Sequence, residues 1–147
     1  MFGILLVSHG KLAEGILDAG KLFYGEKVEK VKTLCLEQTD GGSEFGDRIR
    51  EALTELEAEK EGALVLCDLF GGTPANQCVS VLTEQENLKV VTGMNLAMLI
   101  NVLVERPFME SIEDVNVEEL LTIGKDNILD LRSQIDAFQD TEDADSF

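Results

Sequence analysis

An unbroken run of apolar residues, Ala63-Leu64-Val65-Leu66-Cys67, constrains the fold of this 147-residue chain more than any other feature. A strand with one face in water alternates apolar and polar residues, whereas a strand buried on both faces is apolar throughout. Both faces are covered mainly in parallel sheets, because the crossover helices lie on the two sides. The run therefore predicts a central parallel strand.

Strand-like and helical patterns alternate along the rest of the chain. The other strand-like runs cover about residues 2–7, 28–36 and 88–92. The helical patterns cover about residues 11–24, 44–60, 96–104 and 116–123, and a further helix begins near residue 73. This alternation predicts an α/β fold with an open, mostly parallel sheet between two helix layers, three layers in all.

Capping residues predict where the helices begin and end. We expect Ser43, Thr73 and Asn116 to cap helix starts and Gly25 to end a helix. Residues 127–131 fit either a late strand or a continued helix. The sequence predicts one domain over residues 1–135 and an acidic tail over 136–147 without fixed structure.

The net charge of −17, from 29 acidic and 12 basic residues, argues against nucleic acids and anionic membranes as direct partners. The same charge is compatible with basic protein surfaces. No apolar run approaches the ~20 residues of a membrane helix, and the first residues do not resemble a secretory signal. We therefore expect a cytoplasmic protein.

The chain has three cysteines, Cys35, Cys67 and Cys78, of which Cys35 and Cys67 fall inside apolar strand-like runs and are predicted to be buried and reduced. They lack the C-x-x-C spacing of a zinc site, and the chain has one histidine. We therefore expect no metal and no other cofactor. A nucleophilic role for Cys67 is disfavoured, because the adjacent carboxylate of Asp68 would raise the pKa of the thiol.

The only histidine, His9, ends the first predicted strand, and Asp68 ends the third. In open α/β sheets ligands bind at the carboxyl ends of the strands. The first and third strands commonly lie side by side there, about 4.8 Å apart. A carboxylate that accepts Nδ1–H would fix the imidazole tautomer and leave the Nε2 lone pair free. The sequence thus predicts His9 as a nucleophile oriented by Asp68.

The residues after these two strands favour an anion as the reacting group. The turns Lys11-Leu12-Ala13 and Pro74-Ala75-Asn76 contain no acid, so two helix amino ends are expected to be free for an anion. Backbone N–H groups of Gly71 and Gly72 and the Thr73 hydroxyl would add donors. We predict that these three residues hold a phosphoryl group on the histidine. Taken alone, a Gly-Gly-Thr-Pro segment also fits an ordinary tight turn. A lone histidine also fits an ordinary structural role.

Three segments together resemble the enzyme IIA component of the mannose-type sugar phosphotransferase system. They are Ile4-Leu5-Leu6-Val7-Ser8-His9-Gly10, Asp68-Leu69-Phe70-Gly71-Gly72-Thr73-Pro74-Ala75-Asn76 and Thr92-Gly93-Met94-Asn95-Leu96-Ala97-Met98-Leu99. The resemblance spans about residues 1–135 and implies a cytoplasmic phosphocarrier. It implies that phospho-HPr phosphorylates His9 at Nε2, with Asp68 orienting the ring. Enzyme IIB would then receive the group and phosphorylate a sugar as it enters through the IIC/IID membrane transporter.

The resemblance also implies a homodimer that exchanges an antiparallel edge strand, for which Ile128–Leu131 is the candidate. Phe70 stands where tryptophan also occurs in the family, which we expect to change packing only. Enzyme IIB is expected to be a separate chain. The transported sugar stays open, since enzyme IIA does not contact it.

Two other functions remain open from the sequence. The multiphosphoryl subunit of dihydroxyacetone kinase shares the fold, but the run from Phe70 to Pro74 counts against it. A receiver-like signalling module would be phosphorylated on Asp68. Receivers need an acid pair at the end of the first strand to hold magnesium, and this chain has Val7-Ser8-His9 there.

Overall fold

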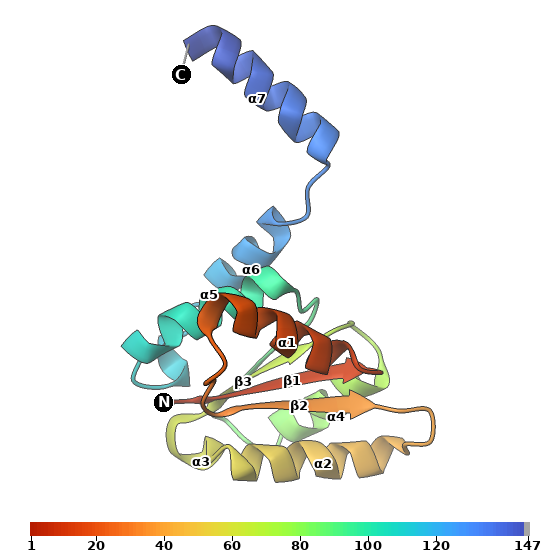
Figure 1. Ribbon diagram of the computed structural model, residues 1–147. Coiled ribbons are helices and arrows are strands. Elements are labelled where there is room, and N and C mark those ends of the chain that lie inside the picture. The colour runs from red at the N-terminus through yellow and green to blue at the C-terminus, as the bar shows by residue number, and fades with distance from the viewer. Residues whose placement is uncertain (146–147) are drawn as a thin grey trace.

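Four parallel strands form the sheet of the computed structural model, which describes the backbone of residues 1–145 and the side chains of residues 1–140. The strands are β1 (Gly3–His9), β2 (Val31–Leu36), β3 (Ala63–Cys67) and β4 (Leu88–Val91). Their order is β2-β1-β3-β4 (Figure 1). The first and third strands are therefore neighbours, as predicted, and the apolar run of β3 is buried throughout.

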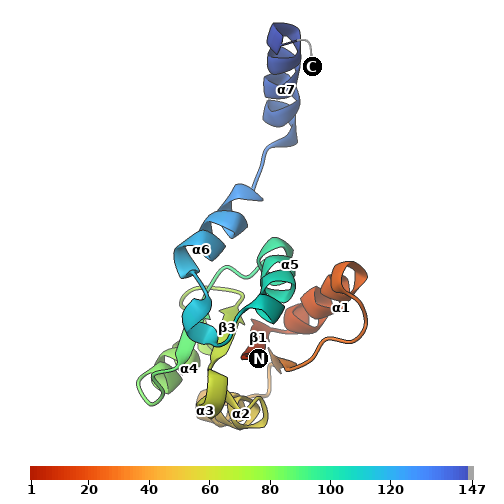
Figure 2. The same ribbon diagram turned by 90° about the vertical axis from the view of Figure 1, so that its left-hand side faces the viewer.

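Two layers of helices cover the sheet, as the alternating pattern predicts (Figures 1 and 2). One face is covered by α1 (Leu12–Tyr24), α5 (Leu96–Glu105), the short turns η1 (Arg106–Phe108) and η2 (Ile112–Asp114), and α6 (Val117–Asp126). The other is covered by α2 (Gly42–Glu55), α3 (Ala58–Glu61) and α4 (Thr73–Leu82).

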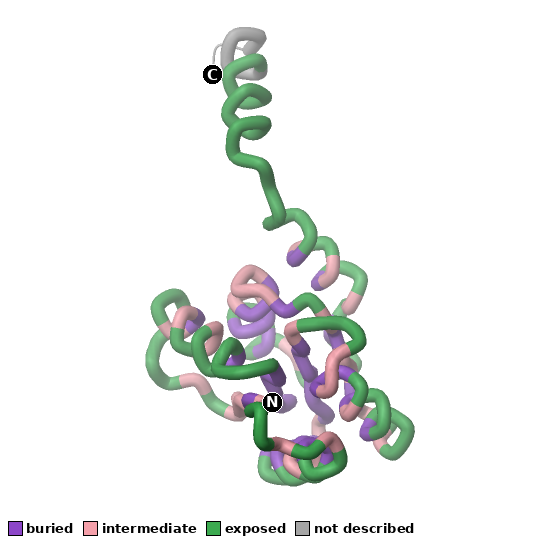
Figure 3. The backbone as a smooth tube through the Cα atoms, turned by 90° about the vertical axis from the view of Figure 1, so that its right-hand side faces the viewer, coloured by how far each residue is buried: buried purple, intermediate pink, exposed green. Residues whose placement is uncertain are grey.

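The core is divided by the sheet into two halves. Side chains of β1 and β3 point alternately to the two faces, because a strand has a side-chain period of two. Leu6 and Leu66 thus lie in the half under α1 and α5, and Val7 and Val65 in the half under α2 and α4. Figure 3 shows the buried backbone concentrated in the sheet and in the helix faces against it.

Two predicted helix caps are wrong by one or two residues. Gly72, not Thr73, is the N-cap of α4, and Gly41, not Ser43, is the N-cap of α2. Both glycines have extended backbone angles and no side-chain capping bond. Thr73 therefore lies inside the first turn of α4, which bears on its predicted contact with an anion.

Other element ends agree more closely with the sequence. Gly25 ends α1, and the Asn116 side chain caps α6 by accepting the N–H of Glu119, as predicted. The helix predicted over 44–60 is divided, because Glu57 adopts a left-handed conformation with φ of 56° between α2 and α3.

A buried arginine ties together the edge of the sheet where the strands begin. The Arg106 guanidinium donates to the carbonyl oxygens of Phe2 at 3.1 Å, Lys30 at 3.2 Å and Glu29 at 2.6 Å. Burial lowers the pKa of Arg106. These bonds link η1 to the segments directly before β1 and β2, at the opposite edge from His9.

The last helix, α7 (Leu131–Asp145), stands apart from the three layers (Figure 1). Residues 127–130 form a connector, neither a strand nor a continuation of α6. The tail predicted to lack structure from residue 136 is helical as far as Asp145, and residues 146–147 lie outside the described residues. The spacing of Leu131, Ile135 and Phe138 gives one apolar helix face, which the acid-rich composition obscured. None of the helices in residues 1–145 has the length and apolar composition needed to cross a bilayer.

Candidate active site

The register of the two central strands brings His9 and Asp68 together. Val7 of β1 pairs with Cys67 of β3, so both side chains leave the sheet at the same edge. The backbone N–H of His9 donates to Asp68 Oδ2 at 2.9 Å, and the ring nitrogen Nδ1 lies 3.0 Å from the same oxygen. The structure thus contains the predicted contact between imidazole and carboxylate.

The two members of this pair differ in exposure. The Asp68 side chain is 10% exposed and the His9 side chain 45% exposed. A carboxylate only accepts hydrogen bonds, so the neutral ring that fits this contact has its hydrogen on Nδ1 and its lone pair on Nε2. The second carboxylate oxygen, Oδ1, is buried and has no hydrogen-bond partner among the described residues. Asp68 therefore binds both the backbone and the ring of His9 through one oxygen, while the imidazole side chain is about half-exposed.

Gly72 lies directly against the imidazole. A Cβ on Gly72 would stand 2.5 Å from His9 Cε1 and 3.0 Å from Nε2, closer than real Cβ atoms approach other groups. A side chain at position 72 would therefore displace the ring from this position. Because Gly72 is the N-cap of α4, the free nitrogen of His9 lies at the amino end of that helix.

The amino end of α4 can hold an anion better than that of α1. The first turn of α4 contains no acid, so its partial positive charge is not neutralised within the helix. The first turn of α1 contains Glu14, because this helix begins at Leu12 and its first turn extends further than the sequence suggested. The prediction of two acid-free helix ends is correct for α4 and wrong for α1.

The other two predicted phosphoryl ligands flank Gly72. Gly71 has a φ of 86°, a conformation that favours glycine, and a Cβ there would meet no atom within 4 Å. Thr73 directs its methyl carbon Cγ2 toward α2, 3.9 Å from where a Cβ on Gly42 would lie. Of the three predicted phosphoryl ligands, Gly72 lies against the histidine ring, and Gly71 and Thr73 lie next to it in the chain.

Ser8 is a site residue that the sequence analysis did not single out. Its hydroxyl is fully buried, accepts the Ala13 N–H at 2.8 Å and donates to the Gly10 carbonyl at 3.1 Å. Gly10 has a φ of 52° and donates its N–H to Leu36 at 2.8 Å. These bonds fix the loop that presents His9. The sequence feature that could have identified Ser8 is a hydroxyl residue at the end of an otherwise apolar strand.

All three cysteines are free and buried, as predicted for Cys35 and Cys67. Cys67 Sγ and Cys78 Sγ lie 3.5 Å apart beneath the site. The contact with Cys78, burial and the Asp68 charge together raise the pKa of the Cys67 thiol. A thiolate at this position is therefore disfavoured.

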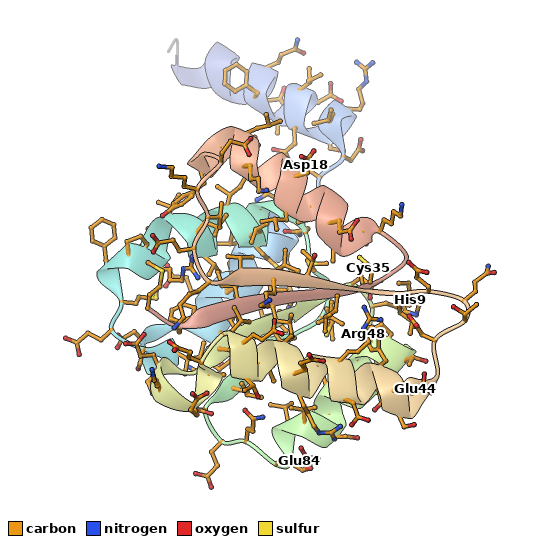
Figure 4. All side chains as sticks on the ribbon, turned by 60° about the horizontal axis from the view of Figure 1, so that its bottom comes forward. His9, Asp18, Cys35, Glu44, Arg48 and Glu84 are labelled. Carbon is orange, nitrogen blue, oxygen red and sulfur yellow. The ribbon has the colours of Figure 1, made fainter. Side chains whose placement is uncertain are left out.

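Figure 4 shows His9 where β1 ends, on the side of the molecule where α2 begins. The arrangement defines a class of protein: an open parallel α/β fold with an oriented, accessible histidine at the point where the winding of the sheet reverses. The family model described as "PTS system fructose IIA component" matches residues 3–118. The chain belongs to this enzyme IIA family of the sugar phosphotransferase system.

Individual relatives agree with this assignment. The sorbose-specific EIIA component of Lacticaseibacillus casei is 31% identical over 101 residues, which cover 69% of this chain and 71% of that protein. The mannose-specific EIIAB component of Escherichia coli K12 is 26% identical over 121 residues, 82% of this chain. The chain spans 35% of that relative's length. The PTS IIA protein associated with the fucose utilization operon of Streptococcus pneumoniae superposes with a TM-score of 0.79 at 29% identity, covering 90% of this chain and 95% of the other.

Proposed function

We propose that this protein is a phosphocarrier in which His9 accepts a phosphoryl group from phospho-HPr and passes it to enzyme IIB. One observation carries the proposal. Nδ1 of His9 is bonded to Asp68 at 3.0 Å while Nε2 lies against Gly72 at the amino end of α4. This geometry supplies a nucleophile of fixed tautomer next to a group of donors suited to a dianion.

The transfer step follows from the two ring nitrogens. The Nε2 lone pair forms a bond to phosphorus while the bond between phosphorus and the donor nitrogen of HPr breaks. The Nδ1 proton stays in its bond to Asp68, and the carboxylate stabilises the positive charge that the ring acquires. The same charge makes imidazole a good leaving group when enzyme IIB takes the phosphoryl group.

Backbone groups next to the ring would hold the transferred dianion. We assign this role to the N–H groups of Gly71 and Gly72 and to the Thr73 hydroxyl, at a helix end without a neutralising acid. The protein would act in the cytoplasm and reach the membrane only indirectly, through enzyme IIB and the IIC/IID transporter.

We also propose that the protein is a homodimer that exchanges the segment Ile128–Leu131. In the single chain Ile128 is 77% exposed, Leu129 55% and Leu131 72%. Such apolar exposure is expected of a segment that pairs with another copy. Analytical ultracentrifugation of the wild type and of an Ile128→Asp variant tests this. We expect a dimer for the wild type and a monomer for the variant. A monomeric wild type would contradict the proposal.

Labelling tests the phosphocarrier function. Wild type and His9→Ala are incubated with radiolabelled phosphoenolpyruvate, enzyme I and HPr. We expect label only on the wild type, stable in alkali and lost in acid, as a phosphohistidine is. Label retained by His9→Ala would falsify the proposal, and sensitivity of that label to hydroxylamine would identify an acyl phosphate such as one on Asp68.

A further inference from the structure

Two buried cysteines lie in contact beneath the candidate active site. Cys67 is the last residue of β3 and is 0% exposed, and Cys78 in α4 is 1% exposed. Their Sγ atoms are 3.5 Å apart. A disulfide brings two sulfur atoms to about 2.05 Å, so an approach of about 1.5 Å would join them. The proposed phosphoryl transfer uses neither thiol.

The third cysteine of the chain, Cys35, lies on the other side of the sheet. It belongs to the half of the core under α1 and α5, whereas Cys67 and Cys78 belong to the half under α2 and α4. The sheet therefore separates Cys35 from the other two. A disulfide within the chain can join only Cys67 and Cys78 among the three cysteines, all of which the structure describes.

The contact also makes the two thiols chemically unequal. The contact with Cys78 and burial raise the pKa of Cys67, whereas the same contact lowers the pKa of Cys78. The S–H group of Cys67 is therefore the donor, and Cys78 becomes the thiolate when one proton is lost. Because the thiolate is the form that attacks an oxidant, Cys78 reacts first and Cys67 second.

We propose that Cys67 and Cys78 are an oxidation site at which hydrogen peroxide forms a disulfide, and that this disulfide slows phosphoryl transfer by His9. Only the effect on transfer rests on the proposed function. The oxidant is a small peroxide, because thiols that are 1% exposed or less are closed to a bulky oxidant such as glutathione disulfide. It enters when the amino end of α4 opens locally, since Gly72 makes no side-chain capping bond there.

Oxidation proceeds in two steps. Cys78 Sγ forms a bond to one oxygen of hydrogen peroxide while the O–O bond breaks, and the departing hydroxide takes up the proton that Cys78 lost. Cys67 Sγ then forms a bond to Cys78 Sγ while the S–O bond of the sulfenic acid breaks, and the hydroxyl leaves with the Cys67 proton as water. Two thiols are oxidised, and one peroxide is reduced to two waters.

The disulfide would join the two elements that place groups against the imidazole. Asp68, which follows Cys67, lies 3.0 Å from Nδ1, and Gly72 begins the helix that contains Cys78. The end of β3 is fixed to β1, because the Asp68 N–H donates to the Val7 carbonyl at 3.2 Å. The approach of the two sulfurs therefore moves α4 more than β3. Gly72 then shifts relative to the ring, and the donors at the amino end of α4 shift with it.

Peroxide treatment of the reduced wild type and of three variants tests the proposal. Cys78→Ala and Cys67→Ala each remove one member of the pair, and Cys35→Ala is the matched control, since it also removes a buried thiol. Each protein is treated with hydrogen peroxide and alkylated in denaturant, and mass spectrometry identifies the cysteines that remain free. Transfer from labelled phospho-HPr is measured before treatment, after it, and after reduction by dithiothreitol.

We expect peroxide to leave only Cys35 of the wild type free for alkylation. Transfer should then slow about tenfold or more, because a displacement of about 1 Å slows a reaction up to about 10²-fold. Dithiothreitol should restore the rate, which separates the disulfide from methionine oxidation, since a sulfoxide needs a dedicated reductase. Cys35→Ala should respond as the wild type does. Cys78→Ala and Cys67→Ala should transfer at the wild-type rate before and after peroxide.

Three results would overturn the oxidation site while leaving the phosphocarrier function intact. The first is alkylation of both Cys67 and Cys78 in the peroxide-treated wild type, and the second is a disulfide that leaves the rate unchanged. The third is an equal loss of rate in both Cys78→Ala and Cys67→Ala. A reduced wild type that phospho-HPr does not phosphorylate would instead refute the proposed function, and mass spectrometry would still report whether the disulfide forms.

Discussion

Replacing Gly72 by alanine tests whether phosphoryl transfer requires the imidazole to lie directly against the amino end of α4. The new Cβ would lie 2.5 Å from His9 Cε1. Carbon atoms in contact are about 3.5–4.0 Å apart, so the ring must move by about 1 Å. A shift of that size lengthens the 3.0 Å contact between Nδ1 and Asp68 Oδ2 beyond hydrogen-bonding distance.

We expect Gly72→Ala to lower the rate of phosphoryl transfer and to leave the stability of the fold nearly unchanged. A displacement of about 1 Å in a reacting group slows a reaction roughly 10²-fold, which corresponds to about 2.7 kcal/mol of activation free energy. Gly72 has φ of −84° and ψ of 170°, angles open to alanine, so the backbone is not strained. The half-exposed ring can also move toward solvent. We therefore expect an unfolding temperature within a few degrees of the wild type.

Quenched-flow transfer from labelled phospho-HPr measures the rate, and histidine ¹⁵N shifts report whether Nδ1 keeps its bond to Asp68. Gly15→Ala is the matched control, because a Cβ at Gly15 in α1 meets no atom within 4 Å. The control should transfer at the wild-type rate. A Gly72→Ala protein with a wild-type rate and an unchanged Nδ1 signal would refute the reasoning.

Three further substitutions separate catalysis from stability. Asp68→Ala should fold but slow transfer about 10²-fold, because the tautomer is no longer fixed; an unchanged rate would remove Asp68 from the mechanism. Arg106→Met should leave buried carbonyls unpaired and lower the free energy of unfolding in urea by about 3 kcal/mol without slowing transfer, and undiminished stability would contradict this. The two bonds from Arg50 lower the pKa of Glu84 below its usual 4.5, so their stabilisation is present above that pH and lost as the pH falls through the folded-state pKa. Glu84→Gln should thus be less stable than the wild type at pH 7 and equally stable in acid, and a difference that persists in acid would argue against it.

The sheet and the pairing of His9 with Asp68 were predictable because both depend on local patterns. Buried parallel strands are recognisable as apolar runs, and residues at the ends of adjacent parallel strands meet at one edge. The contact between Gly72 and the ring was not predictable. It depends on how α4 packs against the sheet, which no short segment of sequence encodes.

Errors arose where the composition and the helix pattern disagreed, or where a helix start was ambiguous. The acidic residues after 136 suggested disorder, but the spacing of Leu131 and Ile135 continues one helix face. The 86% exposure of the Phe70 ring was not predictable either. An aromatic residue within a motif is equally compatible with a place in the core and with a place on the surface.

NMR couplings of the His9 ring nitrogens test the central claim most directly. Two-bond ¹H–¹⁵N couplings and the one-bond ³¹P–¹⁵N coupling are measured before and after phosphorylation by phosphoenolpyruvate, enzyme I and HPr. We predict a hydrogen on Nδ1 in both states and a phosphorus coupling to Nε2 in the second. Phosphorus coupled to Nδ1, or a free protein with its hydrogen on Nε2, would contradict the roles given to Asp68 and to the amino end of α4.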